Sequence, residues 1–205
     1  MHGKVVITGI GRSGTSTLVK LLTELGLDTG FRPGSLLPLD EHLDKGAYKL
    51  TPFDQTCNAG LETYLNFYHC TEDLEKCPRI IKDPMLYNCM DTLTNYLLIE
   101  RLIIPLRDTY EAALSRVKLG NGPGGKWEVE NNVESEVEAQ IRALERVTSK
   151  VVSDAVRLDI PITFIWFPRF VQDVDYCFRV LEPILEGISF DFFKEQFEKT
   201  LKKGI

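Results

Sequence analysis

Hydrophobic and polar positions divide the chain into short apolar runs separated by longer amphipathic stretches. The apolar runs predict four strands, at Lys4–Thr8, Arg79–Lys82, Arg101–Leu106 and Ile162–Trp166. Because Pro105 has no backbone N–H to donate, we expect the pairing of the third strand to weaken there. Strands that alternate with helices are typical of a parallel α/β sheet covered by helices on both faces.

The amphipathic stretches predict the helices. They lie at Thr15–Leu25, from Pro52 to about Tyr68, at Pro84–Leu98, Thr109–Leu119 and Val133–Leu158, and near Val171–Leu185 and Asp191–Lys202. Phe31–Leu50 is expected to be an irregular functional loop, and Gly120–Gly125 a flexible break. No repeat or linker divides the chain, so residues 1–205 are predicted to form a single domain.

Composition and charge limit the possible functions. With 43% hydrophobic and 26% charged residues, the chain is an ordinary globular protein. Its net charge of −6 argues against a nucleic-acid binder, although a local basic pocket is still possible. No apolar run is long enough for a signal peptide or a membrane span, so we expect a soluble, cytoplasmic protein. Five cysteines without metal-ligand spacing indicate reduced, mostly buried thiols and no metal site.

The first predicted strand leads directly into a glycine-rich turn and a helix. This arrangement binds phosphate, because the turn directs backbone N–H groups inward and the helix N-terminus adds partial positive charge. Gly9 and Gly14 have the Walker A spacing, but Thr15 occupies the position of the Walker lysine. The cation lies before the second glycine instead, at Arg12.

Residues Arg12 to Ser16, with the sequence Arg-Ser-Gly-Thr-Ser, resemble the 5′-phosphosulfate loop of the PAPS-dependent sulfotransferase family. PAPS is 3′-phosphoadenosine 5′-phosphosulfate, and its product after transfer is the bisphosphate PAP. The resemblance implies a three-layer P-loop-type fold, PAPS as co-substrate without a required metal, and a nucleotide-binding loop. The loop residues that it assigns are Gly11, Arg12, Ser13, Gly14, Thr15 and Ser16.

Two later features suit the same ligand. Arg107 ends a predicted strand and Ser115 follows on the next helix, where an arginine fork and a hydroxyl fit a phosphate. Their spacing is also similar to the 3′-phosphate site of the family. Lys82 ends another strand and should face the same crevice. Its Lys-Asp-Pro context resembles that of certain sulfotransferases, the tyrosylprotein enzymes among them, which implies that Lys82 steadies the sulfate and leaving group. In the transfer that the resemblance implies, Arg12, Lys82 and the loop amides would stabilise the charge on the departing phosphate.

The residue that accepts the proton of the acceptor is the weakest part of the pattern. The family uses a His or a Glu beyond the first helix, but Lys49 stands where some bacterial relatives carry Glu. Glu41 lies at about the distance from the loop where carbohydrate N-sulfotransferases have their glutamate, and His42 is the next candidate. The acceptor would be a hydroxyl or an amine of a sugar, lipid or small molecule.

Two alternative functions remain open at this point. A P-loop kinase or nucleotide hydrolase shares the predicted fold, but it needs a lysine after Gly14. A PAPS- or PAP-binding protein with impaired catalysis would keep the loop and lack the base, as Lys49 suggests.

The assignment of the base makes the first prediction. The variants Glu41→Ala and His42→Ala each remove one candidate base. The variant that lacks the true base should transfer labelled sulfate from PAPS about 10²–10⁴-fold more slowly, because proton removal contributes on that scale. The affinity for PAP, measured by calorimetry, should stay at the parent value. Parent rates in both variants would disprove the assignment.

Overall fold

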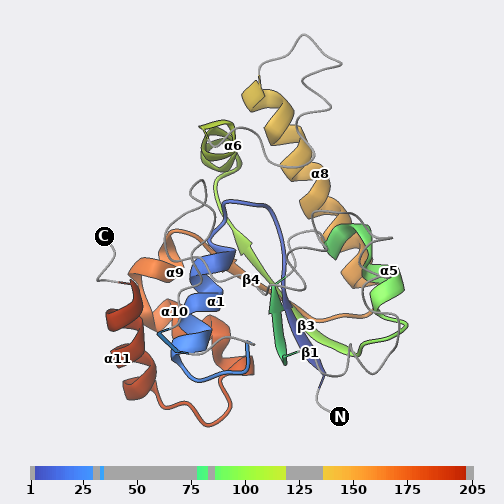
Figure 1. The fold of residues 1–205 in the computed structure, drawn as a ribbon. Coiled ribbons are helices and arrows are strands. Elements are labelled where there is room, and N and C mark those ends of the chain that lie inside the picture. The colour runs from blue at the N-terminus through green and yellow to red at the C-terminus, as the bar shows by residue number, and fades with distance from the viewer. Residues whose placement is uncertain (1–2, 30–32, 35–77, 83–85, 119–135, 202–205) are drawn as a thin grey trace.

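The computed structural model describes residues 3–29, 33–34, 78–82, 86–118 and 136–201 of the 205-residue chain (Figure 1). Its described strands form one parallel four-stranded sheet in the order β2-β1-β3-β4. The strands are β1 (Lys4–Ile7), β2 (Ile80–Lys82), β3 (Ile99–Leu106) and β4 (Ile162–Trp166). The predicted α/β class with a central parallel sheet is therefore confirmed.

Helices cover both faces of this sheet, as Figure 1 shows. One face carries α1 (Thr15–Glu24), α10 (Val174–Leu181) and α11 (Phe190–Leu201), and the other carries α5 (Met90–Leu93) and α8 (Glu136–Arg157). Burial on two faces explains why β1 is apolar throughout its centre and does not alternate with polar residues. Val5 and Ile7 pack in the α1 core, whereas Val6 packs in the α8 core.

A third, smaller core lies at the carboxyl end of the sheet. Here α6 (Thr109–Lys118) packs along α8, as Figure 1 also shows. Its buried members are Ile10, Ala112, Ala113 and Leu144. The small alanine side chains of α6 allow the helix to approach the turn that follows β1 closely. The packing of α6 and α8 is thereby connected to the glycine-rich turn.

The predicted helix Pro84–Leu98 is wrong as one continuous element. Over the described residues 86–98, the structure has a 3₁₀ turn, η1 (Leu86–Asn88), followed by the four-residue helix α5. Cys89, with φ −137°, interrupts the helical backbone between them. Asn, Asp and Thr are weak helix formers, and Thr94 uses its hydroxyl to bond the carbonyl of Asp91 at 3.0 Å. Strand β3 then begins at Ile99, earlier than predicted.

The predicted helix Val171–Leu185 is also divided. It comprises α9 (Arg169–Gln172), α10 and the 3₁₀ turn η2 (Glu182–Ile184). Asp173 is extended, with φ −115° and ψ 98°, and its carboxylate accepts a hydrogen bond from Tyr176 N–H at 2.9 Å. Because this contact is an N-cap, it starts a new helix at Val174. The bounds of α1, α6, α8 and α11 agree with the predicted helices to within a few residues.

Pro105 does not weaken the sheet as predicted. The pairing of β3 with β4 continues past Pro105, which faces Ile165, to Leu106 and Trp166. Backbone groups alternate along a strand, and those of Leu102 and Leu106 face β4. The donor that Pro105 lacks would therefore point towards β1. The pairing of β3 with β1 has already ended at Ile103, opposite Ile7, so no hydrogen bond of that pairing is lost.

Several predicted segments lie outside the described residues. They are the loop Phe31–Leu50, the helix from Pro52 to Tyr68 and the break Gly120–Gly125. Within the described part of the chain, no helix combines the length and apolar character needed to cross a membrane.

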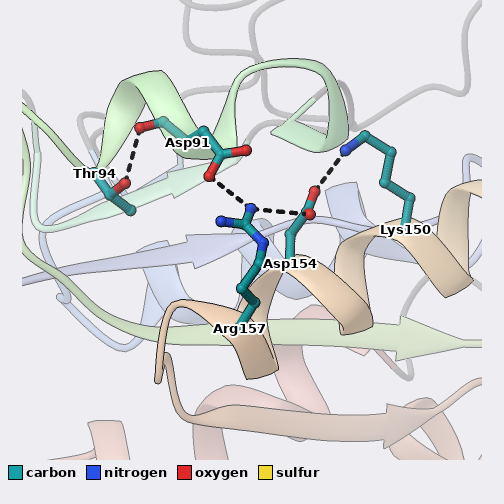
Figure 2. Close-up of polar contacts among 5 residues, drawn as sticks. All are labelled: Asp91, Thr94, Lys150, Asp154 and Arg157. Atoms are coloured by element: carbon teal, nitrogen blue, oxygen red, sulfur yellow. Dashed lines mark hydrogen bonds and ion pairs between the residues drawn. The ribbon is translucent and has the colours of Figure 1, made fainter.

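A cluster of ion pairs joins α8 to α5 on the face of the sheet opposite α1 (Figure 2). The carboxylate of Asp154 accepts hydrogen bonds from Lys150 at 2.7 Å and Arg157 at 3.2 Å. Arg157 also bonds Asp91 of α5 at 2.6 Å. The hydrogen bond from Lys150, followed by the one from Arg157, keeps the pKa of Asp154 below its ordinary value, although burial acts in the opposite direction.

Replacing Asp154 should therefore weaken the fold in a pH-dependent way. Because its pKa is lower in the folded state, Asp154 adds stability above its unfolded pKa and loses it as the pH falls through the folded pKa. Asp154→Asn should lower the unfolding free energy by roughly 1 kcal/mol at pH 7, with the difference vanishing in acid. Urea unfolding at pH 7 and at an acidic pH below the folded pKa of Asp154 measures this difference in unfolding free energy. Glu145→Gln, at an exposed position of the same helix, is the control. An equal loss at both pH values would contradict it.

Candidate functional site

The parallel register brings four strand ends to one edge of the sheet. Ile7 of β1 pairs with Lys82 of β2 on one side and with Ile103 of β3 on the other. The turn that follows β1 therefore begins beside Lys82. Arg107 and Phe167 leave the same edge immediately after β3 and β4. Ligands of parallel α/β sheets bind outside the carboxyl ends of the strands, so this edge is the candidate site.

The turn between β1 and α1 has the curled backbone of a phosphate loop. Gly9, Arg12 and Gly14 have positive φ angles of 129°, 74° and 89°. A non-glycine residue in this region is strained, and such strain gathers at ligand-binding sites. The buried hydroxyl of Ser13 donates to the carbonyl of Ile10 at 2.6 Å, which closes the turn from inside. Gly14 is the N-cap of α1, so the helix N-terminus opens into the loop.

Gly14 is required by its neighbours as well as by its backbone. A Cβ built on Gly14 would lie 2.9 Å from Phe167 Cδ2 and 3.0 Å from Phe170 Cζ. Phe170 is fully buried in the α1 core, and its ring packs edge-on against Phe167 with centroids 5.7 Å apart. The loop is therefore pressed against a rigid aromatic pair, and only glycine fits there.

Lys82 contacts the start of α1. Its Nζ donates a hydrogen bond to Ser16 Oγ at 2.9 Å. The ammonium group therefore reaches the helix N-terminus, where backbone N–H groups point out of the loop. Lys82 and Ser16, which were predicted separately as a catalytic and a binding residue, form one half of the site.

Arg12, Arg107 and Ser115 form the other half. Arg12 Nε donates to Ser115 Oγ at 3.1 Å, and an Arg107 terminal nitrogen lies 3.3 Å from the carbonyl oxygen of Arg12. Arg107 is held by Glu111 at 3.2–3.3 Å, and its guanidinium lies 5.1 Å from the ring centroid of Phe167. The guanidinium of Arg12 therefore reaches α6, which places it with Ser115 instead of with Lys82.

Most of the predicted site residues thus meet at this edge. Ser13 and Thr15 are buried, and the hydroxyl of Ser13 is used inside the loop. Glu41 and His42 lie outside the described residues. Sequence reasoning missed Phe167, which follows a strand end like Arg107, and Arg116, which follows Ser115 directly. The position after each predicted strand was the signal for Phe167.

The chemistry of the edge suits a polyanion. Guanidinium, ammonium and hydroxyl groups surround a loop of backbone N–H donors, all of which can bind phosphate oxygens. Among the described residues, no group of three or more His, Cys, Asp or Glu could hold a metal ion. The thiols of Cys89 and Cys177 are buried, and desolvation raises the pKa of Cys177 to about 12. Cys177 is therefore protonated at neutral pH and unreactive.

Comparison with known proteins finds a distant similarity to a solved structure. No protein-family model matches the chain, and no curated protein matches it. A crystal structure of retinol dehydratase in complex with androsterone and inactive cofactor PAP is similar over 96% of this chain, with a TM-score of 0.45 and 14% sequence identity. The chain spans 64% of that protein's length. The site therefore stands on the contacts of this chain's own residues.

Two glycines allow the packing at Gly14 to be measured. Gly14→Ala adds left-handed strain and a clash with the two phenylalanine rings, whereas Gly26→Ala at φ 81° adds strain with nothing within 4 Å. We expect a loss of about 1 kcal/mol for Gly26→Ala and roughly 2–4 kcal/mol for Gly14→Ala. Urea unfolding measures both values. Equal losses would show that the aromatic pair does not restrict the loop.

Proposed function

We propose that this protein is a sulfotransferase that moves a sulfuryl group from PAPS to a hydroxyl or amine acceptor. The observation that supports this most is the division of the site into two polar groups joined by one loop. Lys82 and Ser16 lie at one end, and Arg12, Ser115 and Arg107 lie at the other. A nucleotide with phosphates on both its 5′ and 3′ positions needs two such groups.

The Lys82 end is proposed to bind the 5′-phosphosulfate. Loop N–H groups and the N-terminus of α1 would bind its oxygens, with the hydroxyls of Thr15 and Ser16 beside them. The ammonium of Lys82 is already at Ser16, so it can stabilise negative charge that develops on the leaving phosphate. Lys82 is therefore the catalytic cation that we favour at this end.

The Arg107 end is proposed to bind the 3′-phosphate. Arg107 approaches the loop from β3, and Ser115 and Arg12 meet 3.1 Å apart beside it. A guanidinium fork with an adjacent hydroxyl is a strong phosphate-binding combination. Glu111 and Phe167 hold the Arg107 side chain in place, which reduces the entropy lost when a ligand binds.

The chain's own residues would then carry the transfer in three ways. The loop and Arg107 fix the nucleotide, so the acceptor oxygen or nitrogen can align with the bond that breaks. Lys82 stabilises the leaving oxygen, and Arg12 links the two halves of the site. Glu41 or His42 would take the proton of the acceptor. PAPS supplies a sulfuryl group that is already activated, so this proposal requires no metal ion.

Ligands with and without a 3′-phosphate test this division. Ser115→Ala should weaken binding of PAP by about 10-fold or more, and Arg107→Gln by about 10–100-fold, because each removes hydrogen bonds to a charged group. Neither should alter the affinity for adenosine 5′-phosphosulfate, which has no 3′-phosphate. Lys82→Gln should weaken both ligands and reduce the transfer rate. Calorimetry with each ligand, together with labelled-sulfate transfer, gives the measurements.

Matched controls separate these effects from general loss of charge. Arg179→Gln and Ser153→Ala change exposed residues on α10 and α8 and should leave both affinities unchanged. Tight binding of Mg-ATP by the parent together with indifference to PAP would overturn the proposal in favour of a kinase or nucleotide hydrolase. Binding of PAP without any transfer would instead identify a nucleotide-binding protein that lacks catalysis.

A further inference from the structure

A buried arginine lies beside the predicted phosphate loop. Arg116 of α6 is only 8% exposed, and one of its terminal nitrogens is 3.0 Å from the position that a Cβ on Gly11 would occupy. Arg116 directly follows Ser115 in the chain, but the two side chains make different contacts. Ser115 bonds Arg12, whereas Arg116 approaches the loop at Gly11. No other buried cation is recorded among the described residues.

Arg116 is held in this place by α8. Its Nε donates a buried hydrogen bond to Gln140 Oε1 at 2.6 Å. Gln140 is fully buried, and its own amide nitrogen has no hydrogen-bond partner among the residues that the structure describes. The long helix α8 therefore holds the side chain of Arg116 where α6 and α8 pack together (Figure 1).

This arrangement is an expensive way to stabilise a fold. Burial lowers the pKa of Arg116, and Tyr87 of η1 offsets part of that effect. The guanidinium nevertheless stays protonated, because an arginine pKa is far above neutral. An apolar pair at these positions would avoid both the desolvated charge and the unpaired amide. The presence of Arg116 and Gln140 in place of such an apolar pair is better explained by a need for positive charge beside Gly11.

We propose that Arg116 is a positioning residue that strengthens anion binding by the phosphate loop through its charge beside Gly11. Gln140 fixes its guanidinium against Gly11, where its charge acts on the loop through the protein interior. A charge acts more strongly there than in water. The inference deepens the proposed function and rests on it, because it takes the loop to bind the phosphosulfate end of the nucleotide. Gln140 in turn selects arginine over an apolar residue at position 116.

Gln140→Glu tests the charge while keeping the contact. A glutamate oxygen can accept the same hydrogen bond from Arg116, so the fold and its Tm should be maintained or improved. Its negative charge cancels that of Arg116 beside the loop. We expect the affinity for PAP to fall about 10-fold, and the KM for PAPS to rise with kcat unchanged, because ground-state and transition-state binding are weakened equally. Arg116→Lys keeps the charge and should bind PAP within about 3-fold of the parent.

Ser149→Glu provides the control. It adds the same charge to an exposed position of the same helix and should leave PAP affinity unchanged. A folded Gln140→Glu protein that binds PAP like the parent would overturn the inference, even if Arg116→Lys fails to fold. A change in Tm alone, without a change in affinity, would also overturn it, because that is the result of a purely structural pair.

Failure of the proposed function would be visible separately. If the parent does not bind PAP, the proposed function fails, and the same variants are then titrated with inorganic pyrophosphate. Weaker pyrophosphate binding by Gln140→Glu would still support a charge that acts through the loop. If the parent binds neither ligand, the loop is not an anion site and both proposals are overturned.

Discussion

The parallel register of β1 with its two neighbours is the constraint on which the rest of the site depends. Ile7 is paired with Lys82 and with Ile103, so β1 and β2 end at the same level of the sheet, while β3 continues to Leu106. Side chains that follow these ends have no further strand to pair with, and they meet around the turn after β1. A shift of the β1–β2 register by one residue would turn Lys82 to the opposite face and separate it from Ser16.

The loop itself is shaped as much by its surroundings as by its own glycines. Arg107 bonds the carbonyl of Arg12, Arg116 lies against Gly11, and the ring of Phe167 lies where a side chain on Gly14 would be. These contacts come from β3, α6 and the end of β4. They offset the cost of the left-handed backbone at Arg12. A loop held in this way needs little reorganisation to bind an anion, which is the condition for strong electrostatic stabilisation.

The charge of the chain is distributed to the same end. The protein carries a net charge of −6, yet Arg12, Lys82, Arg107 and Arg116 gather at one edge of the sheet. A basic region within an acidic molecule attracts a compact polyanion into one place and repels extended polyanions elsewhere. On α8, the carboxylate of Asp154 instead pairs with Lys150 and Arg157. The location of the cations, more than the composition of the chain, therefore makes this edge of the sheet basic.

The sequence by itself determined the local elements. Apolar runs identified the four strands and their common edge, and Gly9 and Gly14 with Arg12 between them predicted the tight turn that the structure shows after β1. Local patterns do not determine where one helix stops and another begins when a cap such as Asp173 intervenes, so the predicted helix Val171–Leu185 was divided. Only the tertiary structure decided that Arg12 turns to Ser115 and that Phe167 and Arg116 join the loop. Such contacts depend on packing between residues distant in the chain, and packing distances leave no periodic signal in a single sequence.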